Sequence, residues 1–188
     1  MIWQHLEPHL PVVNIRLFEH PQLWADYQGK NMEASLTVGT HFSAAHRLAR
    51  PDLSEEENYR IYGKCARPHG HGHNYHLEVT VTGEMNPRTG MIVNLEQLHQ
   101  ILEEVVVEPF DHYFLNKDIP YFAEVVPTAE NIALYIAQLL EKPTADLGVM
   151  LDKIKLIESP NNSCEINCRT LREEKVTEAT REPALAGY

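Results

Sequence analysis

The sequence predicts a single α+β domain, in which β-strands and α-helices share one hydrophobic core. Its 188 residues suffice for such a core, and a content of 43% apolar and 23% charged residues is that of a globular protein. A clean two-residue alternation in one segment predicts a strand, and helical spacing in two others predicts amphipathic helices. We expect the domain to span residues 34–169, after an N-terminal extension (1–33) and before a charged surface tail (170–188).

The first predicted strand begins at Ala34, where the segment ASLTVGTHFSAAH is rich in small and β-favouring residues. His46 ends this strand. Residues 49–64 combine proline, acidic residues and glycine, which predicts a loop with room for a short helix. This loop leads to Cys65 and the next strand.

The second predicted strand, residues 73–81, carries the alternation. Its apolar residues share one face, and they are Tyr75, Leu77, Val79 and Val81. A turn at residues 86–90 and the short apolar run 91–93 then predict a return strand of a hairpin. Asn94 follows as the expected cap of a helix.

Two helices and a closing hairpin complete the prediction. The first helix follows Asn94, and the second follows Thr128, an expected N-cap with the acidic Glu130 in the first turn. Apolar residues recur at helical spacing in both. Residues 149–158 and 164–169 predict two strands joined by a Pro-Asn-Asn turn.

Charge and hydropathy exclude some functions. The net charge of −11 argues against a nucleic-acid surface, which needs a basic face to neutralise phosphates. No apolar run reaches the roughly 18 residues of a membrane span, and the N-terminus lacks the pattern of a secretion signal. The three cysteines, Cys65, Cys164 and Cys168, are too few for a disulfide framework, so we expect a cytoplasmic protein.

The segment CARPHGHGHNYHLEV carries the strongest chemical signal, because a cysteine and several histidines lie close together with glycines between them. Histidines two apart on a strand face the same side, so His71 and His73 can bind one metal ion. An open zinc site needs a third ligand, and His46 is a better candidate than His41, which faces the other side of its strand. The alternatives are strand histidines without a ligand role and a closed site with Cys65 as fourth ligand.

Two further positions carry weaker signals. Asp111 precedes His112 just beyond a helix end, where an aspartate can orient the imidazole and raise its basicity. Glu158 ends an apolar strand before a turn, where a carboxylate can bind the paired N–H edge of a flat heterocycle. An ordinary helix-end turn and an ordinary edge-strand glutamate are the alternatives.

The chain also contains, in this order, the motifs FSAAHRL, EENYRIYGKC, GHGHNY, TGMIVNLEQL, FDHYFLN, YFAEVVPTAEN and ESPNN. From about residue 36 to about residue 168, they resemble the family of 6-pyruvoyl-tetrahydropterin synthases and 6-carboxytetrahydropterin synthases. The resemblance implies a tunnel fold (T-fold): a four-stranded antiparallel sheet with two helices packed on one face. It also implies a homo-oligomer, a trimer or a homohexamer of stacked trimers, with active sites between subunits.

The resemblance implies roles for the site residues as well. The family's metal ligands, which bind Zn²⁺, match His46, His71 and His73. Its catalytic residues match Cys65, Asp111 and His112. Its residues that contact the pterin substrate match Thr128, Glu130 and Glu158.

The implied activity is that of a carbon–oxygen lyase of tetrahydrobiopterin biosynthesis, which converts 7,8-dihydroneopterin triphosphate to 6-pyruvoyl-tetrahydropterin and triphosphate. The alternative is a carbon–carbon lyase of queuosine biosynthesis, which forms 6-carboxytetrahydropterin from the same substrate. The cysteine-to-histidine spacing fits both: three residues separate Cys65 from His69, and five separate it from His71. We favour the longer spacing, because His73 continues directly into the predicted strand.

A hypothesis of another class is a zinc-stabilised, non-catalytic binding module, in which Cys65 is a metal ligand and metal removal unfolds the chain. A zinc hydrolase is a third hypothesis, and it does not need Cys65. With the longer spacing, His69 is either a bystander or a contact of the triphosphate. The sequence indicates no role for Cys164 or Cys168.

Overall fold

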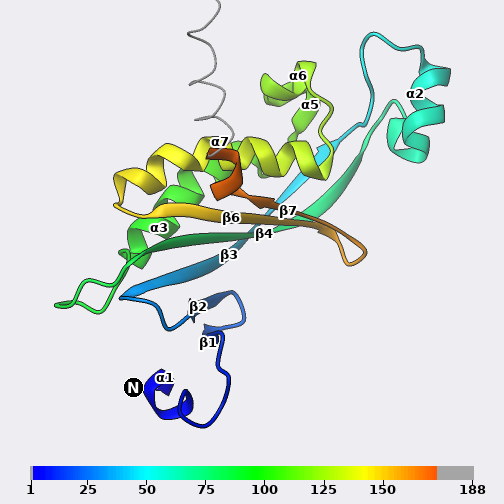
Figure 1. Ribbon diagram of the computed structural model, residues 1–188. Coiled ribbons are helices and arrows are strands. Elements are labelled where there is room, and N and C mark those ends of the chain that lie inside the picture. The colour runs from blue at the N-terminus through cyan, green and yellow to red at the C-terminus, as the bar shows by residue number, and fades with distance from the viewer. Residues whose placement is uncertain (1, 173–188) are drawn as a thin grey trace, which may run out of the picture.

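The computed structural model describes residues 2–172, in which a seven-stranded sheet carries helices on one face (Figure 1). The strands are β1 (Ile15–His20), β2 (Leu23–Tyr27), β3 (Glu33–His46), β4 (His71–Glu84), β5 (Tyr113–Phe114), β6 (Met150–Ser159) and β7 (Asn162–Asn167). Six of them follow the order β1-β2-β3-β4-β6-β7, with antiparallel neighbours. The short β5 pairs in parallel with the end of β3.

The helices come mostly from the segment between β4 and β6. They are α1 (Ile2–Leu6), α2 (Glu55–Tyr62), α3 (Leu95–Leu102), α4 (Glu108–Phe110), α5 (Leu115–Asp118), α6 (Tyr121–Glu124) and α7 (Ala129–Asp146), with short helical turns at η1 (Gly63–Ala66) and η2 (Glu103–Val107). Helix α7 packs on β6 and β7 and also contacts α3, so these two helices lie on the same face of the sheet (Figure 1). No helix in residues 2–172 is long and apolar enough to cross a membrane.

The core lies between this face of the sheet and the helices. On β4, the predicted apolar face is confirmed, since Tyr75, Leu77, Val79 and Val81 are all 0% exposed. Their partners include Leu98 of α3 and Ile136 of α7, which are also fully buried. The alternation of β4 therefore fixes which side of the sheet receives the helices.

The sheet is larger than the expected four strands. Strands β3, β4, β6 and β7 correspond to those four, and the predicted extension adds β1 and β2 beside β3. Most residues of β1 are exposed, Leu17 and Phe18 among them. Because neither face of β1 is buried, its sequence carries no alternation from which the strand could be predicted.

The prediction of a strand at residues 91–93 is wrong. This segment has no strand pairing, although Ile92 and Val93 pack against the core. The physical reason lies in β4, whose two edges are already hydrogen-bonded to β3 and β6. A hairpin return strand therefore has no free edge to pair with.

The predicted helix starts are confirmed. The Asn94 side chain accepts hydrogen bonds from the backbone N–H groups of Glu96 and Gln97, and Thr128 accepts one from Asn131. The loop before Cys65 does hold a short helix, α2, which begins with a capping box formed by Ser54. The closing hairpin is present as β6 and β7, although residues 168 and 169 of the second predicted strand are helical. Of the predicted tail, residues 173–188 lie outside the described part of the chain, and residues 170–172 are helical.

We predict that Leu77→Ala lowers the free energy of unfolding by about 2–5 kcal/mol, because it leaves a cavity in the layer between sheet and helices. The matched control is Leu17→Ala on β1, where the side chain is 61% exposed. Its effect should stay within about 0.5 kcal/mol. Urea unfolding followed by circular dichroism measures both, and equal effects of the two substitutions would contradict the assigned core.

Candidate metal centre and active site

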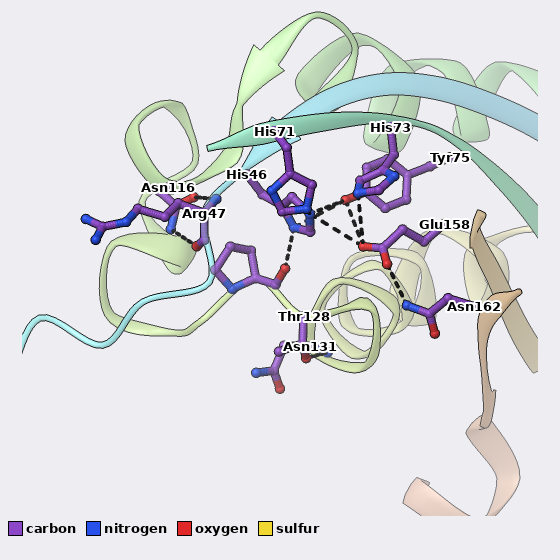
Figure 2. A network of polar contacts seen from close by, with 11 residues as sticks. His46, Arg47, His71, His73, Tyr75, Asn116, Thr128, Asn131, Glu158 and Asn162 are labelled. Atoms are coloured by element: carbon purple, nitrogen blue, oxygen red, sulfur yellow. Dashed lines mark hydrogen bonds and ion pairs between the residues drawn. The ribbon is translucent and has the colours of Figure 1, made fainter. Parts of the chain in front are cut away.

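Three histidines meet on the helix-covered face of the sheet, near the ends of two strands. The antiparallel register of β3 and β4 places His46 opposite His71 and Ala44 opposite His73. Positions 46, 71 and 73 therefore share one face, and their ligand nitrogens all lie within 4.8 Å of one another. The Nε2 atoms of His46 and His71 are 3.1 Å apart (Figure 2).

The tautomer of His46 is set by its other ring nitrogen. Nδ1 lies 2.7 Å from the carbonyl oxygen of Pro127, to which it donates its proton, so the lone pair of Nε2 points at the other two rings. His46 is 1% exposed, and this burial lowers its pKa to about 4, which keeps the ring neutral at pH 7. Burial also lowers the pKa of His71.

One ring nitrogen of the group lacks a partner within the described residues. Nε2 of His73 is buried without a hydrogen bond, which is costly for a polar atom. The Nε2 atoms of His46 and His71 face each other at 3.1 Å, close enough for both to bind the same cation through their lone pairs. The donor set thus fits a divalent metal ion, and the three histidines form a group that can hold one.

Gly70 allows β4 to begin where it does. Its φ of +67° is unfavourable for other residues, and a Cβ atom there would lie 2.6 Å from the carbonyl oxygen of His46 and from a ring carbon of Phe114. The chain can therefore pass close to the end of β3 only with glycine at this position. His71 follows at once and turns toward His46.

Cys65 lies in the short helical turn that precedes β4 and its two histidines of the group. It belongs to η1, and its carbonyl oxygen accepts a hydrogen bond from the backbone of Leu48, just after His46. Burial raises the pKa of Tyr75, and the nearby charges of Glu158 and a Cys65 thiolate raise it further. The Cys65 sulfur is not among the grouped ligand atoms, which disfavours the closed site.

Glu158, at the end of β6, points into the histidine group. Its Oε1 atom is 3.5 Å from Nε2 of His46 and 3.8 Å from Nε2 of His73 (Figure 2). The Tyr75 hydroxyl donates to the same Oε1 at 3.4 Å, and the Asn162 amide donates to Oε2 at 2.5 Å. Each of the two carboxylate oxygens therefore accepts a hydrogen bond.

The start of α7 lies against the same group. Thr128 caps the helix, and the preceding carbonyl of Pro127 is the hydrogen-bond acceptor for His46. Glu130, in the first turn, is exposed. Burial and the charge of Glu130 raise the pKa of Cys164, so Glu130 also lies near β7.

The structure does not bring Asp111 and His112 to this face. Nδ1 of His112 donates to Asp111 over 2.6 Å, and the other carboxylate oxygen accepts from the backbone N–H of Ser43 at 2.7 Å. That backbone hydrogen bond lowers the pKa of Asp111, and His112 lowers it further. The His112 side chain is 82% exposed, and its φ of +63° is rare outside glycine.

His112 lines an open hollow of about 450 Å³ beside the ends of β3 and β4, to which Ser43, Ala45 and Asn74 contribute from the other face of the sheet. The hollow also touches Ala44 and His73. Positions 43, 45 and 74 alternate with Ala44, His46 and His73 along the strands, so they face away from the metal group. The Asp111–His112 pair and the histidine group of one chain thus lie on opposite sides of the β3–β4 ribbon.

Three residues of this site were not predicted from the sequence. Tyr75 was assigned only to the core, and Pro127 and Asn162 were assigned no function. Tyr75 offered a signal, because a hydroxyl on an otherwise aliphatic buried face needs a polar partner. Pro127 acts through its backbone carbonyl, for which a sequence has no signal.

Comparisons with known proteins agree with this geometry. A sequence model described as 6-pyruvoyl tetrahydropterin synthase matches residues 35–169. The chain is 47% identical over 134 residues to the 6-pyruvoyl tetrahydrobiopterin synthase of Homo sapiens, covering 71% of this chain and 91% of the relative. It is 33% identical over 138 residues to a protein of Archaeoglobus fulgidus named for 6-carboxy-5,6,7,8-tetrahydropterin synthesis, covering 72% and 98%.

The fold has a solved counterpart. The structure of Caenorhabditis elegans 6-pyruvoyl tetrahydropterin synthase superposes with a TM-score of 0.67 at 34% identity, covering 73% of this chain and 96% of that one. Because the matched sequence begins at residue 35, β1 and β2 lie outside it.

We predict that His71→Ala abolishes stoichiometric metal binding, because it removes one of the grouped nitrogens. His69→Ala is the matched control: it lies two residues earlier, is exposed, and does not belong to the group. After dialysis, the metal content of His69→Ala, measured by inductively coupled plasma mass spectrometry, should stay at the wild-type level. Equal metal loss in both variants would contradict the assignment.

Proposed function

The chain belongs to the 6-pyruvoyl tetrahydropterin synthase family, and on this premise we propose that it is a zinc-dependent lyase. It converts 7,8-dihydroneopterin triphosphate to 6-pyruvoyl-tetrahydropterin with elimination of triphosphate. The observation that carries the proposal is the group of three histidines, with Glu158 3.5 Å from His46 and Cys65 in the turn just before β4. The named synthases to which the chain is 47–48% identical support the same reaction.

The metal of this proposal is zinc, held by Nε2 of His46, His71 and His73. Three neutral imidazoles with an open position are the ligand set of catalytic zinc sites. Zinc held by these histidines would supply Lewis-acid chemistry, which would acidify a C–H bond of the substrate side chain.

Each residue near the zinc site has a separate task in this proposal. Cys65, as a thiolate, accepts the proton from the substrate side chain. The carboxylate of Glu158 binds the N–H edge of the pterin ring, and Thr128 and Glu130 at the start of α7 bind its other side. Tyr75 and Asn162 orient Glu158 through their hydrogen bonds to its two oxygens.

Asp111 and His112 act in the active site of a different subunit. Since Asp111 and His112 face away from the histidine group of their own chain, we assign them to the site of a neighbouring copy. Asp111 fixes the imidazole through Nδ1, which leaves Nε2 of His112 free to exchange protons with the substrate. This assignment requires a homo-oligomer, and a trimer or a hexamer of stacked trimers fits the family resemblance.

A second candidate product is 6-carboxytetrahydropterin, supported by the similarity to the Archaeoglobus fulgidus protein. The histidine group favours the pyruvoyl product. His71 and His73 belong to it and His69 does not, which corresponds to the longer spacing from Cys65. We place either reaction in the cytoplasm, where the three free cysteines stay reduced.

Incubation of the zinc-loaded protein with 7,8-dihydroneopterin triphosphate, followed by mass spectrometry, tests the proposal. We expect 6-pyruvoyl-tetrahydropterin and triphosphate. 6-Carboxytetrahydropterin with acetaldehyde would assign the chain to the other product, and unconsumed substrate would refute the lyase proposal.

We predict that Cys65→Ala lowers kcat by about 10²–10⁴-fold, the usual contribution of a general acid–base group. Its zinc content should stay at one per chain, because the sulfur lies outside the ligand group. Unchanged turnover would favour a zinc hydrolase, and loss of zinc with unfolding would favour a structural metal site.

We also predict that the inactive variants Cys65→Ala and His112→Ala complement each other when co-expressed. In mixed oligomers, one copy supplies the native thiol and its neighbour the native imidazole. Roughly a quarter of the sites combine both under random mixing across a heterologous interface. Activity of the purified mixture no higher than that of either variant alone would place the pair in the site of its own chain.

A further inference from the structure

The triphosphate is the most strongly charged part of the proposed substrate, and a protein of net charge −11 needs local cations to bind it. The substrate carries its pterin ring and its triphosphate at opposite ends of a short side chain. In the proposed site, Glu158 binds the ring, and the side chain lies at the histidine group. The triphosphate should therefore lie on the side of that group that faces away from Glu158.

A hollow of about 290 Å³ is lined by residues of the loop after β3 and of the segment that holds α5 and α6. Three of its lining side chains are cations, Arg47, Arg50 and Lys117. Two are carboxylates, Glu55 and Glu124. The hollow thus carries an excess of positive charge within an acidic chain.

This hollow borders the histidine group. Its lining residue Arg47 directly follows His46 in the chain. Another lining residue, Val126, directly precedes Pro127, whose carbonyl oxygen accepts the Nδ1 proton of His46. Figure 2 shows Arg47 and Glu158 on opposite sides of the histidines. The hollow therefore lies on the side where the triphosphate is expected.

Two of the cations are free to turn toward an anion. Nζ of Lys117 lies 5.3 Å from the centre of the Phe114 ring, and within residues 2–172 no carboxylate pairs with it. Arg50 pairs with Asp52 at 2.7 Å, but both side chains are more than half exposed. Exposed ion pairs of this kind are weak, so a more highly charged phosphate chain can replace the carboxylate.

Arg47 connects the hollow to the turn that carries Cys65. Its Nε donates to the carbonyl oxygen of Ala66 at 2.8 Å, and its terminal nitrogen donates to Glu55 at 2.5 Å. The Glu55 side chain is 70% exposed, whereas that of Arg47 is 21% exposed. The guanidinium is therefore held in place at the wall of the hollow, with a carboxylate that an incoming phosphate can displace.

We propose that this hollow binds the triphosphate of the substrate through Arg47, Arg50 and Lys117. The assignment rests on the proposed function above. The substrate then spans the site, with its ring on Glu158, its side chain at the histidines and its phosphates in the hollow. Such a site selects the triphosphate ester over the phosphate-free pterin and holds the leaving group while the C–O bond breaks.

Calorimetric titration of the full-length, zinc-loaded protein with inorganic triphosphate tests the hollow without requiring turnover. We expect wild type to bind it, and Arg50→Gln and Lys117→Gln each to bind it about tenfold more weakly, the scale of one lost charge-assisted hydrogen bond. Arg60→Gln is the matched control, because Arg60 is 75% exposed on α2 and does not line the hollow. Equal affinity in all four proteins, or no binding by wild type, would overturn the proposal.

The phosphate-free analogue 7,8-dihydroneopterin provides a second measurement. Its affinity should be the same in wild type and Lys117→Gln, because it has no phosphates to place in the hollow. With the triphosphate substrate, Lys117→Gln should raise KM and leave kcat nearly unchanged, since the contact is the same before and during the reaction. An equal loss of affinity for both ligands would contradict a phosphate contact. If Arg50→Gln does not fold, Lys117→Gln decides.

The two proposals fail separately. If wild type consumes no 7,8-dihydroneopterin triphosphate, but inorganic triphosphate binds it more tightly than it binds Lys117→Gln, the proposed reaction is wrong and the anion site stands. If product forms and Arg50→Gln and Lys117→Gln bind inorganic triphosphate and turn over substrate as wild type does, only the assignment of the hollow is wrong.

Discussion

The register between β3 and β4 is the constraint on which the rest of this structure depends. These strands pair over their whole length, from Glu33 opposite Glu84 to His46 opposite His71. A slip of one residue would turn His71 and His73 to the other face and would expose the apolar side of β4. The burial of the core and the assembly of the histidine group are therefore fixed by the same set of backbone hydrogen bonds.

Burial and metal binding reinforce each other at the end of this ribbon. His46 is almost fully buried, and its Nδ1 proton is donated to Pro127, so the ring is neutral with a defined tautomer. A neutral, oriented imidazole is what a divalent metal requires, since a protonated ring cannot coordinate. Nε2 of His73 is buried without a hydrogen-bond partner, so its lone pair is available to a metal ion.

Much of the fold could be predicted from sequence because its signals are local. The alternation on β4, the caps Asn94 and Thr128 and the closing hairpin each depend on a few adjacent residues. Strand β1 could not be predicted, since its exposed residues carry no pattern. The false strand at 91–93 had a local apolar signal, but whether an edge of β4 was free depended on strands distant in sequence.

The residues of the candidate site could likewise be predicted from the sequence only in part. The spacing of His71 and His73 and the end of the first strand at His46 indicated which side chains share a face. Tyr75, Asn162 and the Pro127 carbonyl were not indicated, because their contacts join β4, β6 and the start of α7. That the Asp111–His112 pair lies on the opposite face follows only from the hydrogen bonds of this segment to the edge of β3.

The central claim is that the pairing of β3 with β4 brings the three histidines together as a metal centre. Its most direct test is a crystal structure of the zinc-loaded protein, with anomalous scattering measured at the zinc absorption edge. The account predicts a strong zinc peak about 2.0–2.1 Å from Nε2 of His46, His71 and His73. A zinc ion held by Cys65, or no zinc at these three histidines, would contradict it.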